Sequence, residues 1–401
     1  MLKGKVVVVG VCGGIAAYKA ADLVSRLKKL DADVHVIMTR SACEFITPLT
    51  FQSLSQQYVV HDMFEEPRSW EIQHVSLAQK GDVFVIAPAT ANIIGKVANG
   101  IADDMLSTTI MATKSPVIFA PAMNSNMYEN TIVQQNINKL KSLGYIFVEP
   151  ESGRLACGDV GKGRLAPTDT IVDAVIQAIG YEKDLKGIKV LVTAGPTREP
   201  LDPVRFISNY SSGKMGYAIA RAAKYRGADV TLITGPVSLQ PVEGIRMIRV
   251  NTALEMYEAV MDNFYESSII IKAAAVGDYR PLHFSADKIK KERDKFEIEL
   301  TKNPDILAEL GKRVQKQVLI GFSMETQHLE QYATKKLVEK NLDLIVANDI
   351  SKEGAGFAVD TNIVKIIDKQ GRIKDLPMTP KEQLAHEVLN EALKIYHNKN
   401  K

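Results

Sequence analysis

The fold is decided by one stretch near the N-terminus, KVVVVGVCGGIAAYKAADLVSRLKKL (residues 5–30). Its first part, Lys5–Val9, is a run of valines of the kind that forms a strand buried on both faces. A glycine-rich turn follows, and Gly13–Leu30 then carries apolar residues at helical spacing with its charges on the other side. A buried strand that leads through a glycine turn into a helix predicts the first βα unit of a parallel sheet. Backbone N–H groups at the start of such a helix can hold a phosphate.

The same alternation of strand and helix continues along the chain and then starts again. In the first half, strands are predicted at Val34–Met38, Asp82–Ala87 and Pro116–Ala120, and a helix at Asp169–Ile179. A charged linker, GYEKDLKG (residues 180–187), follows that helix. In the second half, we expect strands and helices at Ile188–Thr193, Lys214–Arg226, Asp229–Ile233, Ser268–Ala273, Val318–Phe322, Gln331–Lys340 and Leu342–Ala347. The sequence thus predicts an α/β protein of two doubly wound, mostly parallel-sheet Rossmann-like domains, residues 1–187 and 188–401, the first of them flavodoxin-like.

Composition excludes several classes of protein. A length of 401 residues is too great for one compact core. A net charge of +3 is too weak to indicate a nucleic-acid partner. No apolar run approaches 18 residues, so we expect no membrane span, and no secretory leader is evident at the N-terminus. The three cysteines (Cys12, Cys43 and Cys157) are widely spaced, which favours a reducing cytoplasm over a disulfide framework.

Two predicted strand ends in the first half carry segments suited to binding a flat ring. APATAN (residues 87–92) and APAMNSNM (residues 120–127) combine small residues with the hydrogen-bonding side chains of Thr90, Asn92 and Asn124. Either segment alone can equally be a polar turn with a helix cap. The glycine turn lacks the G-x-G-x-x-G spacing of a dinucleotide site, so a mononucleotide is the better interpretation.

Together, five segments of the first half resemble the flavin-dependent cysteine decarboxylases, a family that includes phosphopantothenoylcysteine decarboxylase. The resemblance covers residues 1–180 and rests on GGIAAYK (13–19), HVSLA (74–78), PATAN (88–92), PAMN (121–124) and LACGDVGKGR (155–164). The last segment marks the phosphopantothenoylcysteine branch. One departure is Cys12, which stands where a small hydroxyl residue is expected and would weaken a contact to the flavin phosphate.

This resemblance implies an FMN cofactor and a set of site residues. Cys157 corresponds to the proton donor, His74 to a base or hydrogen-bonding partner, and Asn124 to the group that holds the substrate carboxylate. Met127 would pack against the apolar stem of the substrate. The positions that match FMN contacts are Gly13, Gly14, Ile15, Ala16, Thr39, Ala89, Thr90, Asn92 and Ser107.

The second half has a long loop between a strand and a helix, TAGPTREPLDPVRFISNYSSGKMG (residues 193–216). Long ordered loops are usually functional. Its SSGK does not complete a P-loop, because Met215 follows the lysine. With KAAAVGDYRP (272–281), the lysines at 288, 290 and 291, TKNPDIL (301–307) and GFSMET (321–326), this loop resembles phosphopantothenate–cysteine ligase over residues 188–395.

The second resemblance implies activation of a carboxylate by CTP and Mg²⁺ to an acyl-cytidylate, which the cysteine amine then attacks. Asn209, with Arg205 nearby, would hold the acyl-cytidylate, and Lys288 would stabilise its formation. Lys336 and Lys340, four residues apart in a predicted helix, share one face. The positions matching CTP contacts are Lys272, Ala273, Ala274, Ala275, Asp278, Lys288, Pro304, Asp305, Ile306, Leu307, Phe322, Lys336 and Lys340. No protein ligand of the metal is identified.

The two resemblances together imply a bifunctional enzyme family of coenzyme A biosynthesis. Its ligands would be 4'-phosphopantothenate, cysteine and CTP, and its assembly a homo-oligomer with trimeric contacts in the first half and dimeric contacts in the second. Two alternatives remain open from the residues alone. One is an NAD(P)-dependent oxidoreductase with a Rossmann fold, and the other is a flavin-binding regulatory subunit without catalysis.

Overall fold

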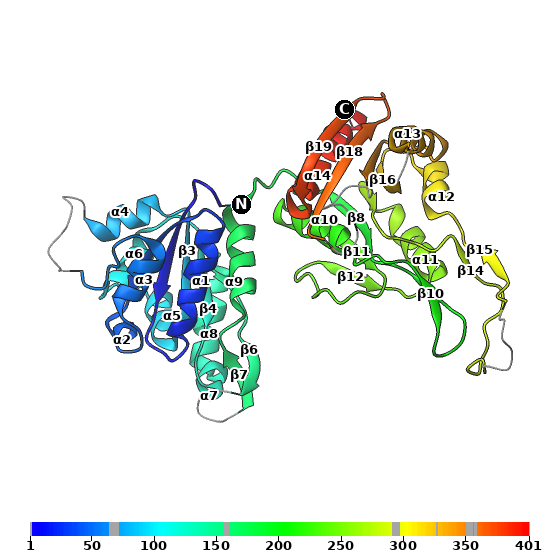
Figure 1. Cartoon of the computed structure of the whole chain (residues 1–401). Coiled ribbons are helices and arrows are strands. Elements are labelled where there is room, and N and C mark those ends of the chain that lie inside the picture. The colour runs from blue at the N-terminus through cyan, green and yellow to red at the C-terminus, as the bar shows by residue number, and fades with distance from the viewer. Residues whose placement is uncertain are drawn as a thin grey trace. The chain divides into compact units, whose positions relative to one another are not determined.

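The structure, a computed structural model, consists of two compact units, Met1–Glu182 and Lys183–Lys401 (Figure 1). It describes residues 2–63, 72–154, 160–290, 297–325, 328–349, 356 and 359–400. The change from one unit to the other falls inside the charged linker at residues 180–187. Among the described residues no helix is long and apolar enough to cross a membrane.

The N-terminal unit is built on a five-stranded parallel sheet with the order β2-β1-β3-β4-β5. This is the flavodoxin-like order, so the predicted fold class is confirmed for this unit. Valines dominate β1 because strands covered on both faces bury nearly every side chain. The strands are β1 (Val6–Val11), β2 (Asp33–Met38), β3 (Val83–Ala89), β4 (Val117–Pro121) and β5 (Ile146–Phe147).

Helices cover both faces of this sheet. On one face, α1 packs against α3 and α9, and on the other α5 packs against α6 and α8. The predicted first helix begins at Ala17 rather than Gly13, because residues 13–16 form the turn itself. The helices are α1 (Ala17–Lys29), α2 (Arg40–Cys43), α3 (Pro48–Ser55), α4 (Gln73–Lys80), α5 (Ala91–Ala98), α6 (Met105–Ala112), α7 (Ser125–Glu129), α8 (Thr131–Ser142) and α9 (Thr168–Val175), which a π-helix (Ile176–Gly180) extends.

The C-terminal unit is built on an eight-stranded sheet with the order β12-β11-β8-β13-β16-β17-β18-β19. Its first six strands are parallel, and β18 and β19 complete one edge as antiparallel strands. This agrees with the predicted mostly parallel sheet. The strands are β8 (Lys189–Ala194), β11 (Asp229–Thr234), β12 (Arg246–Arg249), β13 (Ile269–Lys272), β16 (Val318–Glu325), β17 (Leu344–Asp349), β18 (Thr361–Asp368) and β19 (Ile373–Pro380).

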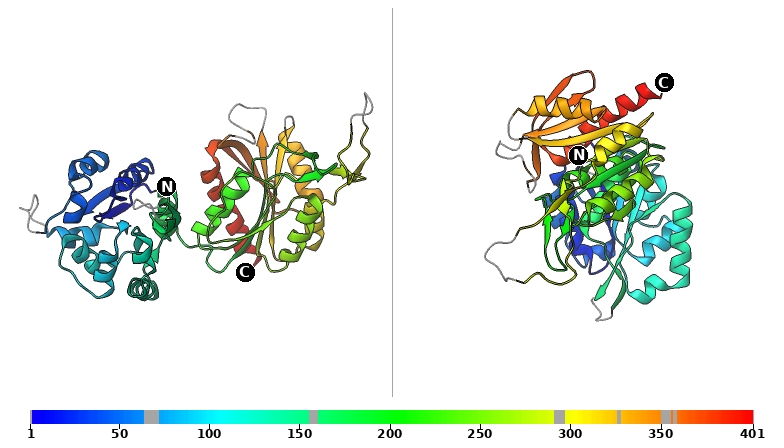
Figure 2. Two further views of the ribbon diagram at one scale, coloured as in Figure 1. Left: turned by 90° about the horizontal axis from the view of Figure 1, so that it is seen from below. Right: turned by 90° about the vertical axis from the view of Figure 1, so that its right-hand side faces the viewer.

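Five helices cover this second sheet, and Figure 2 shows them on its two sides. The apolar residues of α10 and α14 pack together on one face of the sheet, and those of α11, α12 and α13 pack on the other. The helices are α10 (Lys214–Tyr225), α11 (Ala253–Phe264), α12 (Ile306–Arg313), α13 (Leu329–Glu339) and α14 (Lys381–Lys399).

Three small antiparallel pairs lie outside the two main sheets. Each connects segments near the carboxyl ends of the parallel strands, where a doubly wound fold binds its ligands. They are β6 (Glu151–Arg154) with β7 (Val160–Arg164), β9 (Arg198–Pro200) with β10 (Phe206–Ser208), and β14 (Tyr279–Pro281) with β15 (Leu300–Lys302).

Candidate functional site

Each unit has a cavity at the carboxyl ends of its parallel strands. In the N-terminal unit the cavity measures about 470 Å³, and the segments that follow β1, β3, β4 and β7 surround it. Its walls are mostly apolar or uncharged. The lining residues are Gly13, Gly14, Ile15, Ala16, Tyr18, Lys19, Pro88, Thr90, Ala91, Ala122, Met123, Asn124, Met127, Gly163, Arg164 and Leu165.

The glycine turn forms one wall of this cavity. A Cβ on Gly13 would lie 2.4 Å from the Cβ of Ser41, so only glycine lets this turn approach α2 so closely. The thirteen-residue helix α1 starts directly behind the turn. Its free N–H groups and the positive end of its dipole favour an anion at this point.

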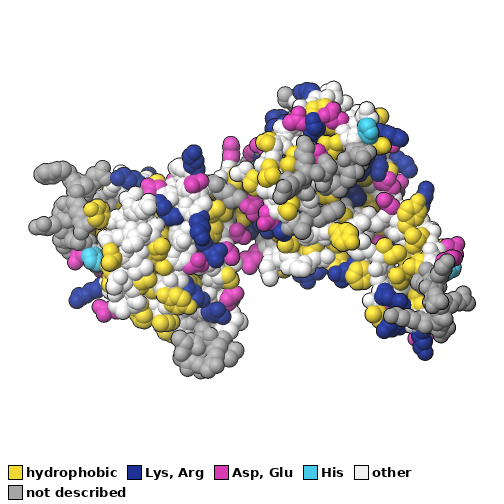
Figure 3. Space-filling view, in the orientation of Figure 1, with side chains coloured by type: hydrophobic (Ala, Val, Ile, Leu, Met, Phe, Trp, Pro, Cys, Tyr) yellow, Lys and Arg dark blue, Asp and Glu magenta, His cyan; other side chains and the backbone are white. Residues whose placement is uncertain are grey.

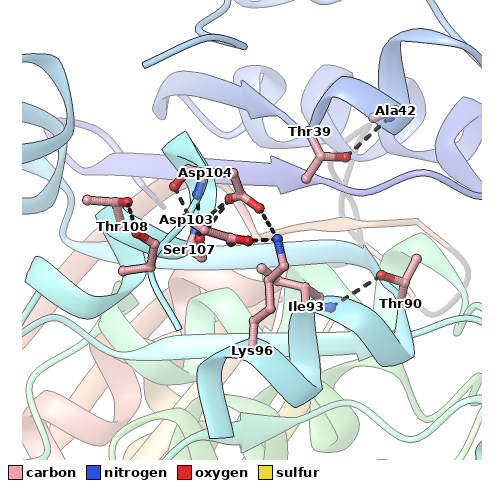
Figure 4. Close-up of polar contacts among 10 residues, drawn as sticks. Thr39, Ala42, Thr90, Ile93, Lys96, Asp103, Asp104, Ser107 and Thr108 are labelled. Carbon is pink, nitrogen blue, oxygen red and sulfur yellow. Dashed lines mark hydrogen bonds and ion pairs between the residues drawn. The ribbon is translucent and has the colours of Figure 1, made fainter. Parts of the chain in front are cut away.

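Three of the predicted FMN positions are helix-capping residues, which Figure 4 shows together. Thr39 Oγ1 accepts from Ala42 N at 3.2 Å at the start of α2, and Thr90 Oγ1 accepts from Ile93 N at 3.5 Å at the start of α5. Ser107 is completely buried and forms a reciprocal capping box with Asp104. Of the three, only Thr90 lines the cavity.

A charged cluster stands beside these caps. The Lys96 ammonium lies 2.6 Å from a carboxylate oxygen of Asp103 and 2.8 Å from one of Asp104, and Figure 4 shows it pointing toward both. Asp104 accepts at the same time from Ser107 N at 2.8 Å. Because Ser107 and Asp104 satisfy each other, this cluster fixes the start of α6. None of its four residues lines the cavity.

The remaining predicted residues of the first half divide into those at the cavity and those away from it. Asn124 and Met127 line it. Ala89 is buried in β3, and Asn92 is exposed on α5, so neither lines the cavity. His74 lies in the first turn of α4, where the sequence places it, but not at the cavity. Cys157 lies outside the described residues.

Cys12, the departure from the expected hydroxyl, is buried at the end of the first strand. Burial raises the pKa of its thiol to about 12, although hydrogen bonding to Thr90 opposes this. The side chain is therefore a neutral thiol at physiological pH. It does not line the cavity, so the structure gives it no direct contact with a ligand there.

The hairpin β6–β7 is held against the turn that carries Asn124. Met123 N donates to Gly163 O at 3.0 Å. Gly163 has a φ of +153°, and a Cβ there would lie 2.2 Å from Met123 O. Only glycine permits this approach, which keeps the segment leading to Arg164 beside Asn124.

The cavity of the C-terminal unit measures about 430 Å³ and has a more polar lining. The carboxyl ends of β13, β16 and β17 surround it together with the segment after β13, the starts of α10 and α12, and α13. The lining residues are Asn209, Ser211, Ser212, Gly213, Lys214, Met215, Gly216, Lys272, Ala273, Ala274, Ala275, Val276, Gly277, Asp278, Asn303, Pro304, Asp305, Ile306, Leu307, Phe322, Ser323, Met324, Lys336, Lys340, Asn348, Gly356, Asn362 and Lys381.

The start of α10 lies against the sheet because two glycines permit it. Gly213 has a φ of +78°, and a Cβ on Gly216 would lie 2.5 Å from the Cβ of Ala194 in β8. All six residues from Ser211 to Gly216 line the cavity. The N–H groups at the start of α10 therefore meet the cavity at a second anion-favouring point, beside the start of α12.

Three lysines, one from β13 and two from α13 and its C-cap, meet at this cavity. They are Lys272 at the end of β13, Lys336 in α13, and Lys340, which follows α13. Burial and the neighbouring charge of Lys336 lower the pKa of Lys272 to about 8. Lys340 Nζ lies 2.7 Å from Asp305 Oδ2, and Lys336 Nζ donates to Phe322 O at 3.2 Å. The described lining has two carboxylates, Asp278 and Asp305, against five lysines, because Lys214 and Lys381 also line the cavity. This excess of positive charge suits a polyphosphate.

At the edge of the same cavity, three buried polar side chains have atoms with no hydrogen-bond partner among the described residues. These atoms are Ser323 Oγ, both amide atoms of Asn348, and Asn362 Oδ1. Asn348 pairs with Val364 across β17 and β18, so Asn348 and Asn362 project from one face of the sheet. Buried polar atoms are nearly always satisfied in folded proteins. Unpaired ones that line a cavity therefore indicate the place of a polar ligand.

The structure places the other predicted ligase residues at different distances from the cavity. Asn209 lines it, and its Nδ2 donates to Ala275 O at 3.1 Å. Arg205 does not line it but donates from Nε to Asp202 Oδ2 at 2.9 Å. Lys288 is exposed and does not line it either. The neighbouring Ile289 N donates to the same carboxylate of Asp202 at 3.1 Å, which ties this segment to Arg205.

Sequence reasoning missed several residues of the two cavities. Lys19 and Arg164 belong to segments that carry the family resemblance, but no role of their own was assigned to them from the sequence. Ser211–Gly216 belongs to a loop that does not complete the P-loop pattern. Asn362 and Lys381 come from β18 and α14, which no motif marked. Within the described part of the chain, no group of three or more His, Cys, Asp or Glu side chains could hold a metal ion.

In comparisons with known proteins, two family models match separate parts of the chain. Residues 1–180 match the Flavoprotein family, and residues 185–396 match the DNA/pantothenate metabolism flavoprotein C-terminal domain. The coenzyme A biosynthesis bifunctional protein CoaBC of Bacillus subtilis (strain 168) is 50% identical over 394 residues, which are 98% of this chain and 97% of that protein. Its namesake from Escherichia coli (strain K12) is 45% identical over 404 residues, 100% of this chain and 99% of that protein.

Among solved structures, the C-terminal domain of a coenzyme A biosynthesis bifunctional protein CoaBC is 42% identical, with a TM-score of 0.47, and covers 54% of this chain and 100% of that one. The two family matches and the full-length relatives together identify the family of this chain. The chain belongs to the family of bifunctional coenzyme A biosynthesis proteins, which join a decarboxylase to a ligase.

Proposed function

We propose that residues 1–187 decarboxylate 4'-phosphopantothenoylcysteine with FMN, and that residues 188–401 make this compound from 4'-phosphopantothenate, cysteine and CTP. The observation that carries the proposal is the pair of cavities. One is largely apolar and begins at a glycine turn, as a flavin requires, and the other combines two helix starts with three lysines, as a triphosphate requires. Family membership decides against the NAD(P)-dependent oxidoreductase and the non-catalytic subunit.

The residues of the first cavity fit FMN. The glycine turn and the start of α1 would hold its phosphate, while Pro88, Thr90 and Ala91 would lie against its ring. When bound, the flavin supplies a reversible hydride acceptor, which lets a thioaldehyde form next to the carboxylate that leaves. This route would have no net redox change, so it would need no external oxidant.

The chain's own residues must hold the substrate and move its protons. Asn124 would bind the substrate carboxylate, and Met127 would pack against the apolar stem. His74 would serve as a base or hydrogen-bonding partner at the early steps. Cys157 would protonate the enethiolate that decarboxylation leaves, since that carbanion equivalent needs a proton before the hydride returns.

In the second cavity, the start of α10, the start of α12 and the three lysines would hold the triphosphate of CTP. Mg²⁺ would be bound largely by the phosphates, in line with its preference for phosphate oxygens and water. Attack of the 4'-phosphopantothenate carboxylate would release pyrophosphate and give the acyl-cytidylate, and the cysteine amine would then displace CMP. Asn209 would hold this intermediate, and Lys288 would stabilise the charge that develops during its formation.

We also propose that the enzyme is a cytoplasmic homo-oligomer, with trimeric contacts in the first half and dimeric contacts in the second. Figure 3 shows hydrophobic side chains spread over the visible face of the N-terminal unit. Three residues of the cavity lining, Ile15, Tyr18 and Met127, are 62%, 60% and 49% exposed. Apolar residues at a ligand cavity that also face solvent favour coverage by another copy.

The direct test is to incubate the purified protein with 4'-phosphopantothenate, cysteine, CTP and Mg²⁺ and to identify the products by mass spectrometry. We expect CMP and pyrophosphate with 4'-phosphopantothenoylcysteine, followed by CO₂ and 4'-phosphopantetheine. Omission of CTP should stop both steps, and removal of the flavin should stop only the second. Tight binding and turnover of NADPH, with no consumption of CTP, would overturn the proposal.

Gly163→Ala should weaken the decarboxylase by about tenfold or more in kcat/KM, because small displacements of positioning groups are costly. The new Cβ would press on Met123 O and push the hairpin away from Asn124. Gly153→Ala, in the same hairpin, is the matched control, because its Cβ would meet Arg164 only at 3.7 Å. Ligase activity should stay unchanged in both variants. Equal decarboxylase activity in the two would show that this contact does not position the site.

CTP use should weaken as the pH rises from 7 to 9. Lys272 is charged below its pKa of about 8 and neutral above it, so its attraction to the triphosphate is lost on the alkaline side. We expect kcat/KM for CTP, measured by pyrophosphate release, to fall by about tenfold across this range. Lys272→Arg should flatten the profile, because arginine stays charged, and Lys272→Met should be weak at every pH. If Lys272→Met showed the same pH dependence of kcat/KM for CTP as the unmodified enzyme, Lys272 would not be its cause.

A further inference from the structure

Two cations share the cavity of the N-terminal unit. Lys19 in α1 and Arg164 at the end of β7 are the charged members of its described lining. Within the described part of the chain, the Lys19 ammonium has no ion-pair or hydrogen-bond partner. Arg164 Nε lies 4.0 Å from Glu151 Oε2, which is a loose contact. The cavity therefore has more positive charge than its own residues balance.

The two groups also influence each other. Burial and the charge of Arg164 lower the pKa of Lys19, and Glu151 is the acidic group that opposes this. One partly exposed carboxylate cannot neutralise a guanidinium and an ammonium together. Such an arrangement is stabilised when an anion enters the cavity, because the anion replaces the repulsion between the cations with two charge-assisted contacts.

We propose that Lys19 and Arg164 bind the phosphomonoester of the substrate and so select the phosphorylated compound over its dephosphorylated form. The inference rests on the proposed function of this cavity. A phosphomonoester carries close to two negative charges at neutral pH. The planar fork of an arginine and the point charge of a lysine are complementary ways to bind it.

The position of Arg164 favours the substrate over the flavin as the source of this phosphate. Its hairpin is bonded through Gly163 to the turn of Met123 and Asn124, which the proposed function assigns to the substrate. The proposed function already assigns the flavin phosphate to the backbone N–H groups of the glycine turn. Both cations are part of the same mostly apolar cavity as Asn124 and Met127, so a substrate with an apolar middle can contact both sets of residues.

The test compares two substrates with the full-length, FMN-saturated enzyme: 4'-phosphopantothenoylcysteine and pantothenoylcysteine. We expect Lys19→Gln and Arg164→Gln each to lower kcat/KM for the phosphorylated compound by about tenfold, chiefly through KM. Turnover of pantothenoylcysteine should change less than about twofold. Lys29→Gln in the same helix and Lys162→Gln in the same strand are matched controls, since neither lysine lines the cavity. Both should match the unmodified enzyme.

Any other result of this experiment overturns the inference, and each result identifies a different role for the two cations. An equal loss with both substrates would assign the cations to the substrate carboxylate. A weaker affinity for FMN with an unchanged affinity for riboflavin, measured on flavin-free protein, would assign them to the flavin phosphate. Unchanged kinetics in both variants would give them no role, while the proposed function would stand. If the unmodified enzyme decarboxylates neither compound, the proposed function itself fails.

Discussion

Asn124→Asp should reduce decarboxylation by about 100-fold or more while the protein keeps its fold and its flavin, since a like charge opposite a substrate carboxylate costs several kcal/mol. The reason lies in the double role of Asn124. Its Oδ1 caps α7 by accepting from Asn126 N at 2.9 Å, and its amide lines the cavity. Aspartate caps a helix as well as asparagine does, so the variant changes mainly the charge that faces the substrate. The measurement is CO₂ release with the flavin spectrum recorded in parallel.

Asn130→Asp is the control for this experiment. Asn130 caps the next helix, α8, in the same way, with its Oδ1 accepting from Ile132 N at 2.9 Å, but it does not line the cavity. We expect normal turnover from it. If Asn124→Asp also turned over normally, the substrate carboxylate would have to bind elsewhere. If both variants lost activity with their flavin, the loss would come from the helix caps and not from substrate binding.

The parallel cores of both units could be predicted from the sequence because their strands are buried on both faces. Runs such as Val6–Val9 and Ile269–Ile271 are apolar without interruption, the first ending at Gly10 and the second at Lys272, which an alanine follows. Such a pattern has few other interpretations. The edge strand β19 was not predicted, because it is largely exposed and its residues alternate little in polarity. Exposed edge strands leave a weak signal in a sequence. The neighbouring β18 is largely buried and was also not predicted.

Site residues could be predicted from the sequence where a local turn requires glycine. They were harder to predict where segments far apart in the sequence meet. Glycine turns are local, and the glycine turn and the segments that end in Asn124 and Asn209 do line the cavities. Lys381 shows the opposite case. It begins α14, far along the chain, and its Nζ donates to Gly356 O at 3.0 Å at the edge of the second cavity. No spacing within the sequence connects α14 with the start of α10, so only the three-dimensional structure reveals such a residue.

The second large effect is expected from Asn209→Asp, which should separate the two steps of the ligase. Asn209 Nδ2 donates to Ala275 O at 3.1 Å, and a carboxylate cannot donate to this carbonyl. The variant therefore loses an anchor of the Ala273–Ala275 segment and places a negative charge beside the acyl-cytidylate. Activation by CTP should survive in part, because the three lysines and both helix starts remain. Capture by cysteine should fall by about 100-fold, with the intermediate accumulating or leaking into solution.

Lys288→Gln should fail at the other step. Loss of its charge would remove stabilisation from the phosphates during activation, so pyrophosphate release should fall even without cysteine. The measurement is a quenched reaction analysed by mass spectrometry, with and without cysteine.

Asn263→Asp is the matched control for Asn209→Asp, because Asn263 Nδ2 also donates to a carbonyl, Ala259 O at 2.8 Å, but lies in α11 outside the cavity. Equal loss of pyrophosphate release in Asn209→Asp and Lys288→Gln, with no intermediate in either, would show that these two residues do not divide the steps between them. Because Lys288 is exposed and does not line the cavity, an unaffected Lys288→Gln would leave activation to Lys272, Lys336 and Lys340.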